Sequence, residues 1–316
     1  MMKYIVLALA SIVCALDYQN AVLPHDAPDP GAIYYNGAYY AATTSTGNVL
    51  ASGYLPIYMS TNLANWTLVS HAFTESTKPR WSKNNFWAPE IKQMSGEVFN
   101  LYFTAMNPSG VTCVGVVTSN KITGPYKDAT GQPFSCDGLD STMVKSKGTP
   151  YLVWKHNPAS GIVARELTPD GLKFTESIIH PLIRNDKPWE GILVEAPWLI
   201  WQEPYFYMFY SSNFFNTLQY NVGVARSKAL LGPWEKRDAP IVRSNKKWAG
   251  PGHCSVISVR NEGNKWFMLY HSWRADSFKN FTVGRHMLLD SVHFSNDGWP
   301  YVQGDSPSID PIPIPN

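Results

Sequence analysis

The sequence predicts an all-β fold, and within that class a five-bladed β-propeller, from three observations. Short strands rich in aromatic residues recur along the chain, and most follow a turn signal such as Asn36-Gly37 or Gly263-Asn264. These strands begin about 50 to 60 residues apart, which is the period expected of a propeller blade. A second repeat supports the same period, because segment 114–119 and the similar segment 222–227 each lead to a Gly-Pro pair.

Each aromatic strand is expected to belong to one blade. The five strands are expected at residues 38–41, 99–103, 151–154, 205–210 and 266–270. No helix of any length is indicated, and no linker rich in Pro or Ser divides the chain, so residues 16–316 are expected to form a single propeller domain. Two sheets packed as a sandwich are the alternative architecture.

The composition narrows the choice of ligand. Hydrophobic residues make up 44% of the chain, and after the N-terminus no apolar run is long enough to span a membrane. Aromatic residues reach 14%, which is rich for a core alone and suits stacking on the C–H faces of sugars. The net charge of +2 and the scattered basic residues argue against a nucleic-acid partner. We expect a monomer that does not associate with membranes.

Residues 1–15 are expected to be a signal peptide. Lys3 precedes an apolar segment, and the small residues Val13 and Ala15 occupy the positions that signal peptidase prefers. The alternative is a buried first strand. Cleavage would make the protein secreted and extracellular.

Whether the cysteines form a disulfide, and whether the two N-glycosylation motifs are used, depends on that compartment. Cleavage would remove Cys14, and Cys113 and Cys136 could then pair and leave Cys254 over, although the sequence alone does not determine the pairing. Acceptor motifs for N-glycosylation begin at Asn65 and Asn280, so a eukaryotic source would make the protein a glycoprotein.

A polar residue precedes each aromatic strand by about ten residues, in another short strand. These residues are Asp29, Glu90, Asp140, Glu195 and His253. The first strand of a propeller blade lines the central channel, so the five side chains are expected to converge. Four acids and one histidine are unfavourable to assemble unless function or a cation compensates.

Three of these carboxyl groups can make a glycosidase. Glu195 lies among apolar residues such as Val194 and Trp198, and an apolar setting raises a carboxyl pKa, as a general acid requires. A second carboxylate must be ionised to activate water, and a third can keep the acid protonated by repulsion between like charges. Taken singly, each acid could be an ordinary turn, hairpin or strand-end residue, but their common register with the blades favours catalysis.

Six motifs in this order resemble those of glycoside hydrolase family 43. They are Pro-Asp-Pro at 28–30, Trp-Ala-Pro-Glu at 87–90, Gly-Leu-Asp at 138–140, Val-Glu-Ala-Pro at 194–197, Gly-Pro-Gly-His at 250–253 and Gly-Arg at 284–285. The resemblance implies a five-bladed propeller that cleaves arabinofuranosyl or xylosyl bonds with inversion at the anomeric carbon. It implies a polysaccharide or oligosaccharide substrate from plant cell-wall hemicellulose or pectin.

The same resemblance assigns roles. Asp29 is similar to the general base, Glu195 to the general acid, and Asp140 to the residue that raises the acid's pKa and orients it. Arg285 resembles the arginine that meets the sugar. His253 resembles the channel histidine, which in arabinan-cleaving members lies beside a hydrated calcium or sodium ion. No cofactor is implied as a requirement.

Two of these role assignments are less direct than the others. Asp26 lies three residues before Asp29 and could be the base instead, although Asp29 directly precedes a proline and a strand. Ser141 follows Asp140 where the family often has proline.

Three residues of the second blade, Phe86, Trp87 and Glu90, are expected to contact substrate, and so is His253 of the fifth blade. The alternatives are a channel-structure role for Glu90 and packing between blades for Trp87.

Other functions are less well supported. The chain contains no zinc-protease, nucleophile-elbow or phosphate-loop motif. Within the family we expect an α-L-arabinofuranosidase or arabinan-cleaving enzyme, with a β-xylosidase as the alternative. A sugar-binding propeller without catalysis is the alternative of another class.

Overall fold

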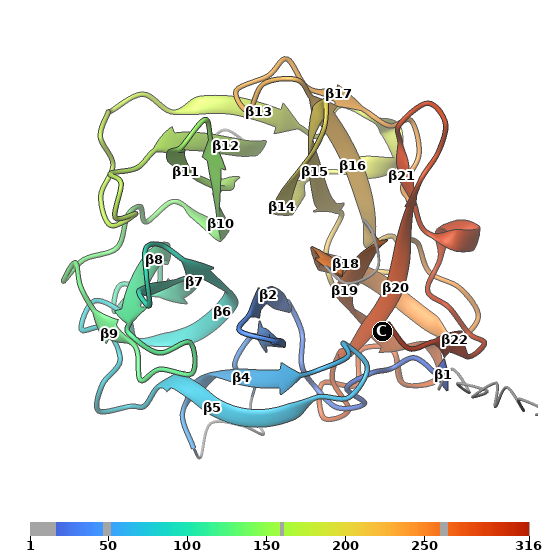
Figure 1. The fold of residues 1–316 in the computed structure, drawn as a ribbon, viewed down its shortest axis with the longest axis horizontal. Helices are drawn as coiled ribbons and strands as arrows, with labels where there is room; N and C mark the ends of the chain where they lie inside the picture. The colour runs from blue at the N-terminus through green and yellow to red at the C-terminus, as the bar shows by residue number, and fades with distance from the viewer. Residues whose placement is uncertain (1–16, 47–51, 159–160, 260–264, 316) are drawn as a thin grey trace, which may run out of the picture.

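The computed structural model describes residues 17–46, 52–158, 161–259 and 265–315, so the predicted signal peptide lies outside the described residues. Five four-stranded sheets surround a central axis, and the first strand of each lies innermost (Figure 1). The predicted five-bladed β-propeller is therefore confirmed. Among the described residues, no helix has the length and apolarity that a membrane crossing requires.

Each blade is an antiparallel sheet whose strands follow one another in the chain. Blade I contains β2 (Gly31–Tyr35), β3 (Ala38–Ala42), β4 (Tyr54–Ser60) and β5 (Thr67–Phe73). Blade II contains β6 (Asn84–Gln93), β7 (Phe99–Met106), β8 (Thr112–Ser119) and β9 (Lys127–Asp128). Blade III contains β10 (Gly138–Ser146), β11 (Thr149–His156), β12 (Gly161–Glu166) and β13 (His180–Arg184). Blade IV contains β14 (Val194–Gln202), β15 (Tyr205–Ser212), β16 (Asn221–Ser227) and β17 (Glu235–Lys236). Blade V contains β18 (Trp248–Val259), β19 (Lys265–Arg274), β20 (His286–Phe294) and β21 (Pro300–Tyr301).

The aromatic strands of the sequence are the second strands of the blades, namely β3, β7, β11, β15 and β19. The repeated segments 114–119 and 222–227 belong to the third strands β8 and β16, and each Gly-Pro pair precedes the short fourth strand. Short 3-10 helices occur at Pro188–Glu190, Ala275–Ser277 and Gln303–Asp305.

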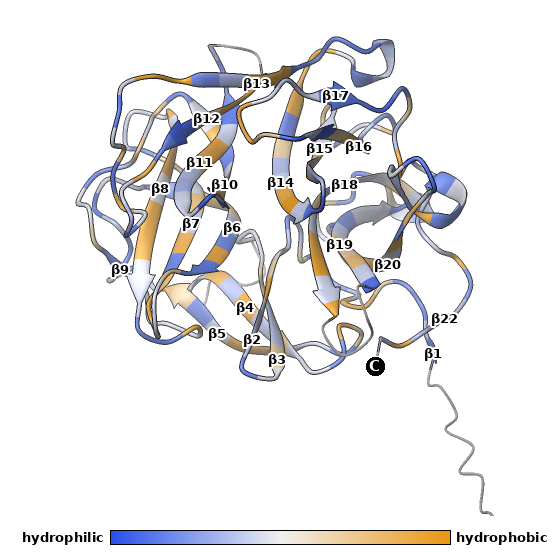
Figure 2. Ribbon diagram, turned by 45° about the horizontal axis from the view of Figure 1, so that its top comes forward, coloured by the Kyte–Doolittle hydropathy of each residue, from blue (hydrophilic) through white to orange (hydrophobic). Residues whose placement is uncertain are grey.

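The apolar core lies between neighbouring blades. One cluster joins Phe73 of blade I to Phe86 and Phe103 of blade II, and another joins Tyr102 of blade II to Trp154 of blade III. Figure 2 shows hydrophobic segments along β8, β14 and β19, which belong to three different blades. Burial of these faces stabilises the ring of blades, because aromatic side chains remove large apolar areas from water.

The two ends of the described chain meet at blade V. Strand β1 (Asp17–Tyr18) pairs with β22 (Ile312–Pro313), and both lie at the same edge of the molecule (Figure 1). Asn20 binds both the carbonyl and the amide of Leu289 in β20, at 2.9 and 2.8 Å. These contacts tie the first described residues to the last blade.

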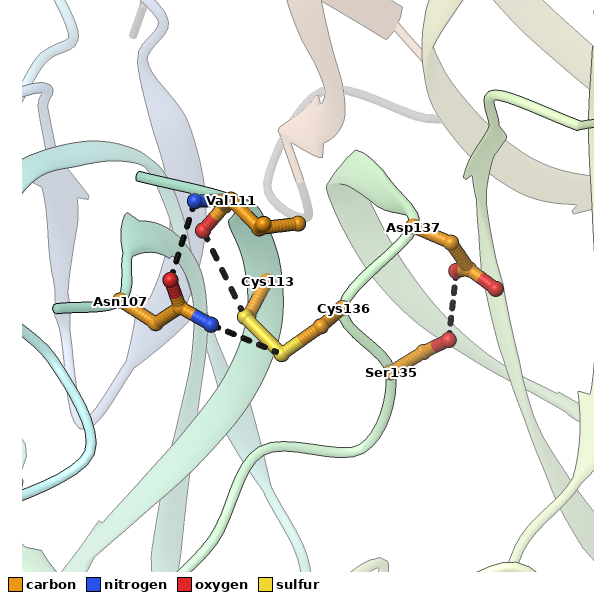
Figure 3. The surroundings of a disulfide bond; sticks show 6 residues. All are labelled: Asn107, Val111, Cys113, Ser135, Cys136 and Asp137. Atoms are coloured by element: carbon orange, nitrogen blue, oxygen red, sulfur yellow. Dashed lines mark hydrogen bonds between the residues drawn. A yellow bond between two sulfur atoms is a disulfide. The ribbon is translucent and has the colours of Figure 1, made fainter. Parts of the chain in front are cut away.

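A disulfide joins Cys113 of β8 to Cys136, which lies in the segment that leads to β10 (Figure 3). The pairing that the sequence left open is therefore Cys113 with Cys136, and Cys254 is buried and free. The segment is also held by Asp137, which accepts a hydrogen bond from Ser135 and contacts the ring of His156. It is thus anchored on both blades before it enters the strand that carries Asp140.

Candidate active site

Every blade carries, in its innermost segment, a non-glycine residue whose φ lies between 47° and 57°. These residues are Asp29, Ala88, Asp140, Ala196 and His253. Non-glycine residues rarely adopt this conformation, and where they do the strain is concentrated at functional sites. The shared conformation identifies the positions that correspond in the five blades.

Of the five polar residues expected to correspond, three do: Asp29, Asp140 and His253. The expectation is wrong for Glu195, which lies one residue before Ala196, and for Glu90, which lies two residues after Ala88. In β6, β10, β14 and β18 the pairing register shifts around this position, as in a β-bulge. Sequence spacing does not reveal such a shift, because the motifs remain almost evenly spaced.

The amide of the positive-φ residue usually meets a polar side chain that lies in, or two residues after, the second strand of the preceding blade. Ala88 donates to Thr44 Oγ1 at 2.8 Å, Asp140 to Thr104 Oγ1 at 2.9 Å and His253 to Ser211 Oγ at 2.7 Å. The amide nitrogen of Asp29 also lies 3.3 Å from Nδ1 of His271 in blade V, but this contact is not an amide hydrogen bond, because Nδ1 carries the hydrogen that points to the Asp29 carboxylate. The three amide hydrogen bonds hold the site's backbone between blades.

A cavity of about 620 Å³ lies over these residues. It is lined by six residues that the sequence predicted for the site: Asp29, Trp87, Asp140, Glu195, His253 and Arg285. The other polar lining residues are Asp26, Thr44, Ser45, Thr46, Lys155 and Tyr220. The apolar lining residues are Leu139, Leu193, Phe214, Phe215, Trp273 and Phe281.

Asp29 is surrounded by donors. Its Oδ1 lies 3.0 Å from Arg285 Nη1 and 3.0 Å from His271 Nδ1, and its Oδ2 accepts the hydroxyl of Thr44 at 2.5 Å. Burial alone would raise the pKa of Asp29, but Arg285, followed by His253 and His271, holds it well below its ordinary value. Asp29 is therefore ionised at neutral pH and has fixed oxygen positions.

His271 has a defined tautomer. Arg285 Nη1 lies 3.2 Å from Nε2 of His271, and a guanidinium can only donate, so Nε2 must be the acceptor. Burial, assisted by the charge of Arg285, lowers the pKa of His271 to about 3, so the ring is neutral and its hydrogen is on Nδ1. That hydrogen points to Asp29, which gives the carboxylate a neutral donor in addition to the arginine.

Asp140 and Glu195 form the second part of the site. Burial raises the pKa of Asp140 well above its ordinary value, and the charge of Glu195 raises it further. Burial also raises the pKa of Glu195, against the opposing effects of Lys155 and Tyr220. Since the two carboxyl groups titrate as a pair, a state in which both are ionised is disfavoured and the pair retains a proton more strongly than two separate acids.

Glu195 is held at both oxygens. Tyr220 donates to Oε1 at 3.0 Å, and the ammonium of Lys155 lies 3.3 Å from Oε2. Tyr220 is itself fixed by stacking on His271, with ring centroids 5.7 Å apart and planes 11° apart. The carboxyl group therefore has one main orientation in the cavity.

Two residues that were expected to contact substrate, Phe86 and Glu90, do not line the cavity. Phe86 is 1% exposed and packs between blades against Phe73 and Tyr54. Glu90 is buried in the channel below, where it pairs with Lys92 and accepts the amide of Met143 at 3.0 Å. The channel-structure alternative for Glu90 therefore fits the geometry, whereas Trp87 lines the cavity.

Asp26, the rival base, has a different partner. Its Oδ1 accepts the backbone amide of Arg285 at 2.8 Å, and burial raises its pKa. A Cβ on Gly284 would lie 2.1 Å from Asp26 Cγ, so only glycine allows this approach. Asp26 thus positions the backbone of Arg285, and Asp29 is the more strongly ionised of the two acids.

The space beneath the cavity, next to the predicted channel histidine, is small. Asp140 and His253 border a second cavity of about 20 Å³ there, which has room for about one water molecule. Calcium takes six to eight oxygen ligands. In the part of the chain that the structure describes, no three His, Cys, Asp or Glu side chains are grouped to hold a metal.

Four residues that contact the proposed base or acid were not predicted: Thr44, Lys155, Tyr220 and His271. A signal for two of them exists in the sequence, since Thr104, Lys155, Ser211 and His271 each follow three apolar or aromatic residues at the same point of their second strands. Tyr220 lies between strands and belongs to no repeated pattern.

Comparison with known proteins agrees with this geometry. Residues 18–300 match the model of the family "Glycosyl hydrolases family 43". An extracellular exo-α-(1→5)-L-arabinofuranosidase of Cellvibrio japonicus is 22% identical over 88% of this chain and 86% of its own length. An extracellular endo-α-(1→5)-L-arabinanase of Bacillus subtilis is 26% identical over 86% of each chain. The crystal structure of a thermostable family-43 glycoside hydrolase superposes with a TM-score of 0.82 at 26% identity, covering 95% of this chain and 99% of that one.

Proposed function

Because the chain belongs to glycosyl hydrolase family 43 and is therefore a glycosidase, we propose that it is a secreted, inverting enzyme that releases arabinofuranosyl units from arabinan or arabinoxylan. One observation carries the mechanism. An ionised Asp29, fixed by Arg285 and His271, shares a cavity with the carboxyl pair Asp140 and Glu195, which retains a proton. Carboxyl groups whose environments separate their pKa values are the mark of assigned acid and base roles.

In the proposed reaction Asp29 is the general base and Glu195 the general acid. Asp29 removes a proton from water while the water oxygen forms a bond to the anomeric carbon. Glu195 gives its proton to the glycosidic oxygen as the bond from that oxygen to the anomeric carbon breaks, and the bonding electron pair stays with the leaving oxygen. A single displacement of this kind inverts the anomeric configuration.

Asp140 has the proposed role of keeping Glu195 protonated. A negative charge on either carboxyl group makes ionisation of the other less favourable. The amide of Ala196 donates a hydrogen bond to Asp140, which fixes the position of its carboxyl group. Arg285 faces the cavity beside the base and is proposed to meet a sugar hydroxyl as well as to stabilise the charge of Asp29.

The cavity walls suit a sugar chain. Phe281 and Phe214 are 63% and 49% exposed at the cavity, and Phe281 packs edge-to-face on Trp273 at 5.1 Å. Exposed rings at a cavity can stack on the apolar faces of sugar rings. The arabinan preference is supported by the two relatives named above, which are described as an exo-α-(1→5)-L-arabinofuranosidase and an endo-α-(1→5)-L-arabinanase.

Secretion has independent support. Both relatives are described as extracellular. The bond between Cys113 and Cys136 is of the kind that persists in oxidising compartments.

Hydrolysis of linear arabinan, arabinoxylan, an aryl α-L-arabinofuranoside and an aryl β-xyloside tests the proposal. We expect release of arabinose, with the β-anomer appearing first by proton NMR, and a loss of about a hundredfold or more in Glu195→Gln. Preference for the xyloside would instead identify a β-xylosidase. Sugar binding without hydrolysis by the wild type would identify a lectin-like propeller and refute the catalytic mechanism.

A further inference from the structure

Blade III departs from the other blades at one position. The second strands of blades II, IV and V place Thr104, Ser211 and His271 beside the amide of the next blade's positive-φ residue, and in blade I Thr44 does the same.

The strand pairing shows that Lys155 is the corresponding residue of blade III. In each blade the reference point is the residue that directly precedes the positive-φ residue. That residue pairs with Thr104 in blade II, with Ser211 in blade IV and with Lys155 in blade III.

Lys155 makes a different contact from its counterparts. Its ammonium reaches Glu195 Oε2 at 3.3 Å, whereas the amide of Ala196 is taken up by the carboxylate of Asp140. The side chains of Lys155 and Glu195 are 13% and 12% exposed, so water screens this ion pair weakly. Lysine at this position of blade III thus places a positive charge beside the proposed acid.

We propose that Lys155 is a positioning residue for catalysis, which orients Glu195 and stabilises the carboxylate that remains once the proton has passed to the leaving group. This inference rests on the proposed function. Both oxygens of Glu195 have a donor, Lys155 at Oε2 and Tyr220 at Oε1.

The charge balance of the step requires such a group. When the proton moves from Glu195 to the glycosidic oxygen, the bond to the anomeric carbon breaks and a negative charge appears on Glu195. Lys155 takes no part in this proton transfer and places the opposite charge 3.3 Å from the carboxylate. A cation placed where charge develops stabilises the transition state without reorganisation.

The other charged and titratable groups near Glu195 act differently. Asp140 from β10 and Asp29 before β2 are acidic, and Tyr220, before β16, is a neutral donor. Three more groups lie one contact further away: His253 beside Asp29 and Asp140, His271 on Tyr220, and Arg285 on Asp29. Of the groups the structure describes here, Lys155 is the cation that contacts Glu195.

Three variants separate this role from a structural one. Lys155→Thr installs the residue that blades I and II carry at this point, Lys155→Met keeps the length without the charge, and Lys155→Arg keeps the charge. Loss of the charge should raise the pKa of Glu195, so the basic limb of the pH profile of kcat/KM should move to higher pH by about one unit or more in the first two variants.

The kcat of these two variants on arabino-oligosaccharides should fall about tenfold or more. On an activated aryl glycoside it should fall much less, because a good leaving group needs little protonation. Lys155→Arg should retain the wild-type limb.

An unmoved basic limb in Lys155→Met together with a lower Tm would show that Lys155 only joins blades III and IV, and would overturn the proposal. Carboxyl carbon NMR of labelled glutamate provides a readout that needs no substrate, since the Glu195 resonance should titrate at higher pH in Lys155→Met than in the wild type. If the wild type hydrolyses no glycoside, the proposed function fails along with this inference. If it hydrolyses glycosides and the Lys155 variants keep the wild-type pH profile and Glu195 titration, only this inference fails.

Discussion

Arg285 Nη1 lies 3.0 Å from Asp29 Oδ1, although the two residues are 256 positions apart in the sequence. The contact joins the start of blade I to the segment between β19 and β20 of blade V. It therefore makes the ionisation of the proposed base depend on closure of the propeller ring.

Removal of the Arg285 charge should impair the base. In Arg285→Met the pKa of Asp29 should rise, and because a base works only when ionised, the acidic limb of kcat/KM should move to higher pH by about one unit or more. Arg285→Lys, which keeps the charge, should move the limb less. The measurement is the pH dependence of kcat/KM on an aryl arabinofuranoside, and an acidic limb that stays in place in Arg285→Met would exclude this electrostatic role.

Adjacent residues Phe86 and Trp87 should respond in opposite ways to truncation. Trp87 lines the cavity, so Trp87→Ala should raise KM for oligosaccharides about tenfold with little change in Tm. Phe86 is 1% exposed, so Phe86→Ala should cost about 3–5 kcal/mol of stability and leave KM near its wild-type value.

Steady-state kinetics and thermal unfolding of the two variants provide the check, each serving as the control for the other. A lower Tm with unchanged KM in Trp87→Ala would mean that this ring packs between blades instead.

A buried acid far from the cavity should make stability depend on pH. Burial raises the pKa of Asp290 in β20 to about 6 from an ordinary 3.8, although Tyr270 donates to it at 2.6 Å and Asn20 at 3.1 Å. The folded protein therefore binds this proton more tightly than the unfolded chain does. The resulting stability is present below pH 3.8 and is lost as pH rises to about 6, and its full extent is about 3 kcal/mol.

Asp290→Asn, which cannot ionise, should show a weaker fall of Tm between pH 4 and about 6.5 than the wild type does. The comparison requires the two unfolding curves at each pH, since other acids contribute equally to both proteins. Parallel Tm profiles would show that Asp290 is ionised in the folded protein throughout this range.

The fold was predictable because each blade repeats the same local signals. Turn residues, aromatic second strands and a period near that of a blade are all properties of neighbouring residues, and they placed β3, β7, β11, β15 and β19 correctly. The pairing of Cys113 with Cys136 was not decided by the sequence, since a free Cys254 could equally have been a partner.

The site was predictable only in part. Asp29, Asp140 and Glu195 were brought to one cavity as expected, because first strands line the channel in any propeller. The register was wrong at Glu90, because a bulge places it two residues beyond the corresponding position and into the channel. Lys155 was missed, because its contact with Glu195 depends on which second-strand residue faces the next blade.

Asp140→Asn should displace the basic limb in the direction opposite to Lys155→Met. The charge of Glu195 raises the pKa of Asp140, and because repulsion between two like charges acts on both groups, the neutral amide should lower the pKa of Glu195. Glu195 must be protonated to act, so the basic limb of kcat/KM should move to lower pH, and kcat should fall as the acid is protonated in fewer molecules. The backbone amide of Asp140 donates to Thr104 at 2.9 Å and does not depend on the carboxyl group, so the fold around the site should persist.

The pH profile of Asp140→Asn on a substrate with a poor leaving group is the measurement, and Asp26→Asn is the matched control. Asp26 lines the same cavity but accepts the amide of Arg285, so its amide variant should leave the basic limb where it is in the wild type. A wild-type rate and basic limb in Asp140→Asn would reduce Asp140 to a hairpin residue. A basic limb that moves in Asp26→Asn by as much as in Asp140→Asn would show that any acid in the cavity affects Glu195, and that the third blade holds no dedicated partner for it.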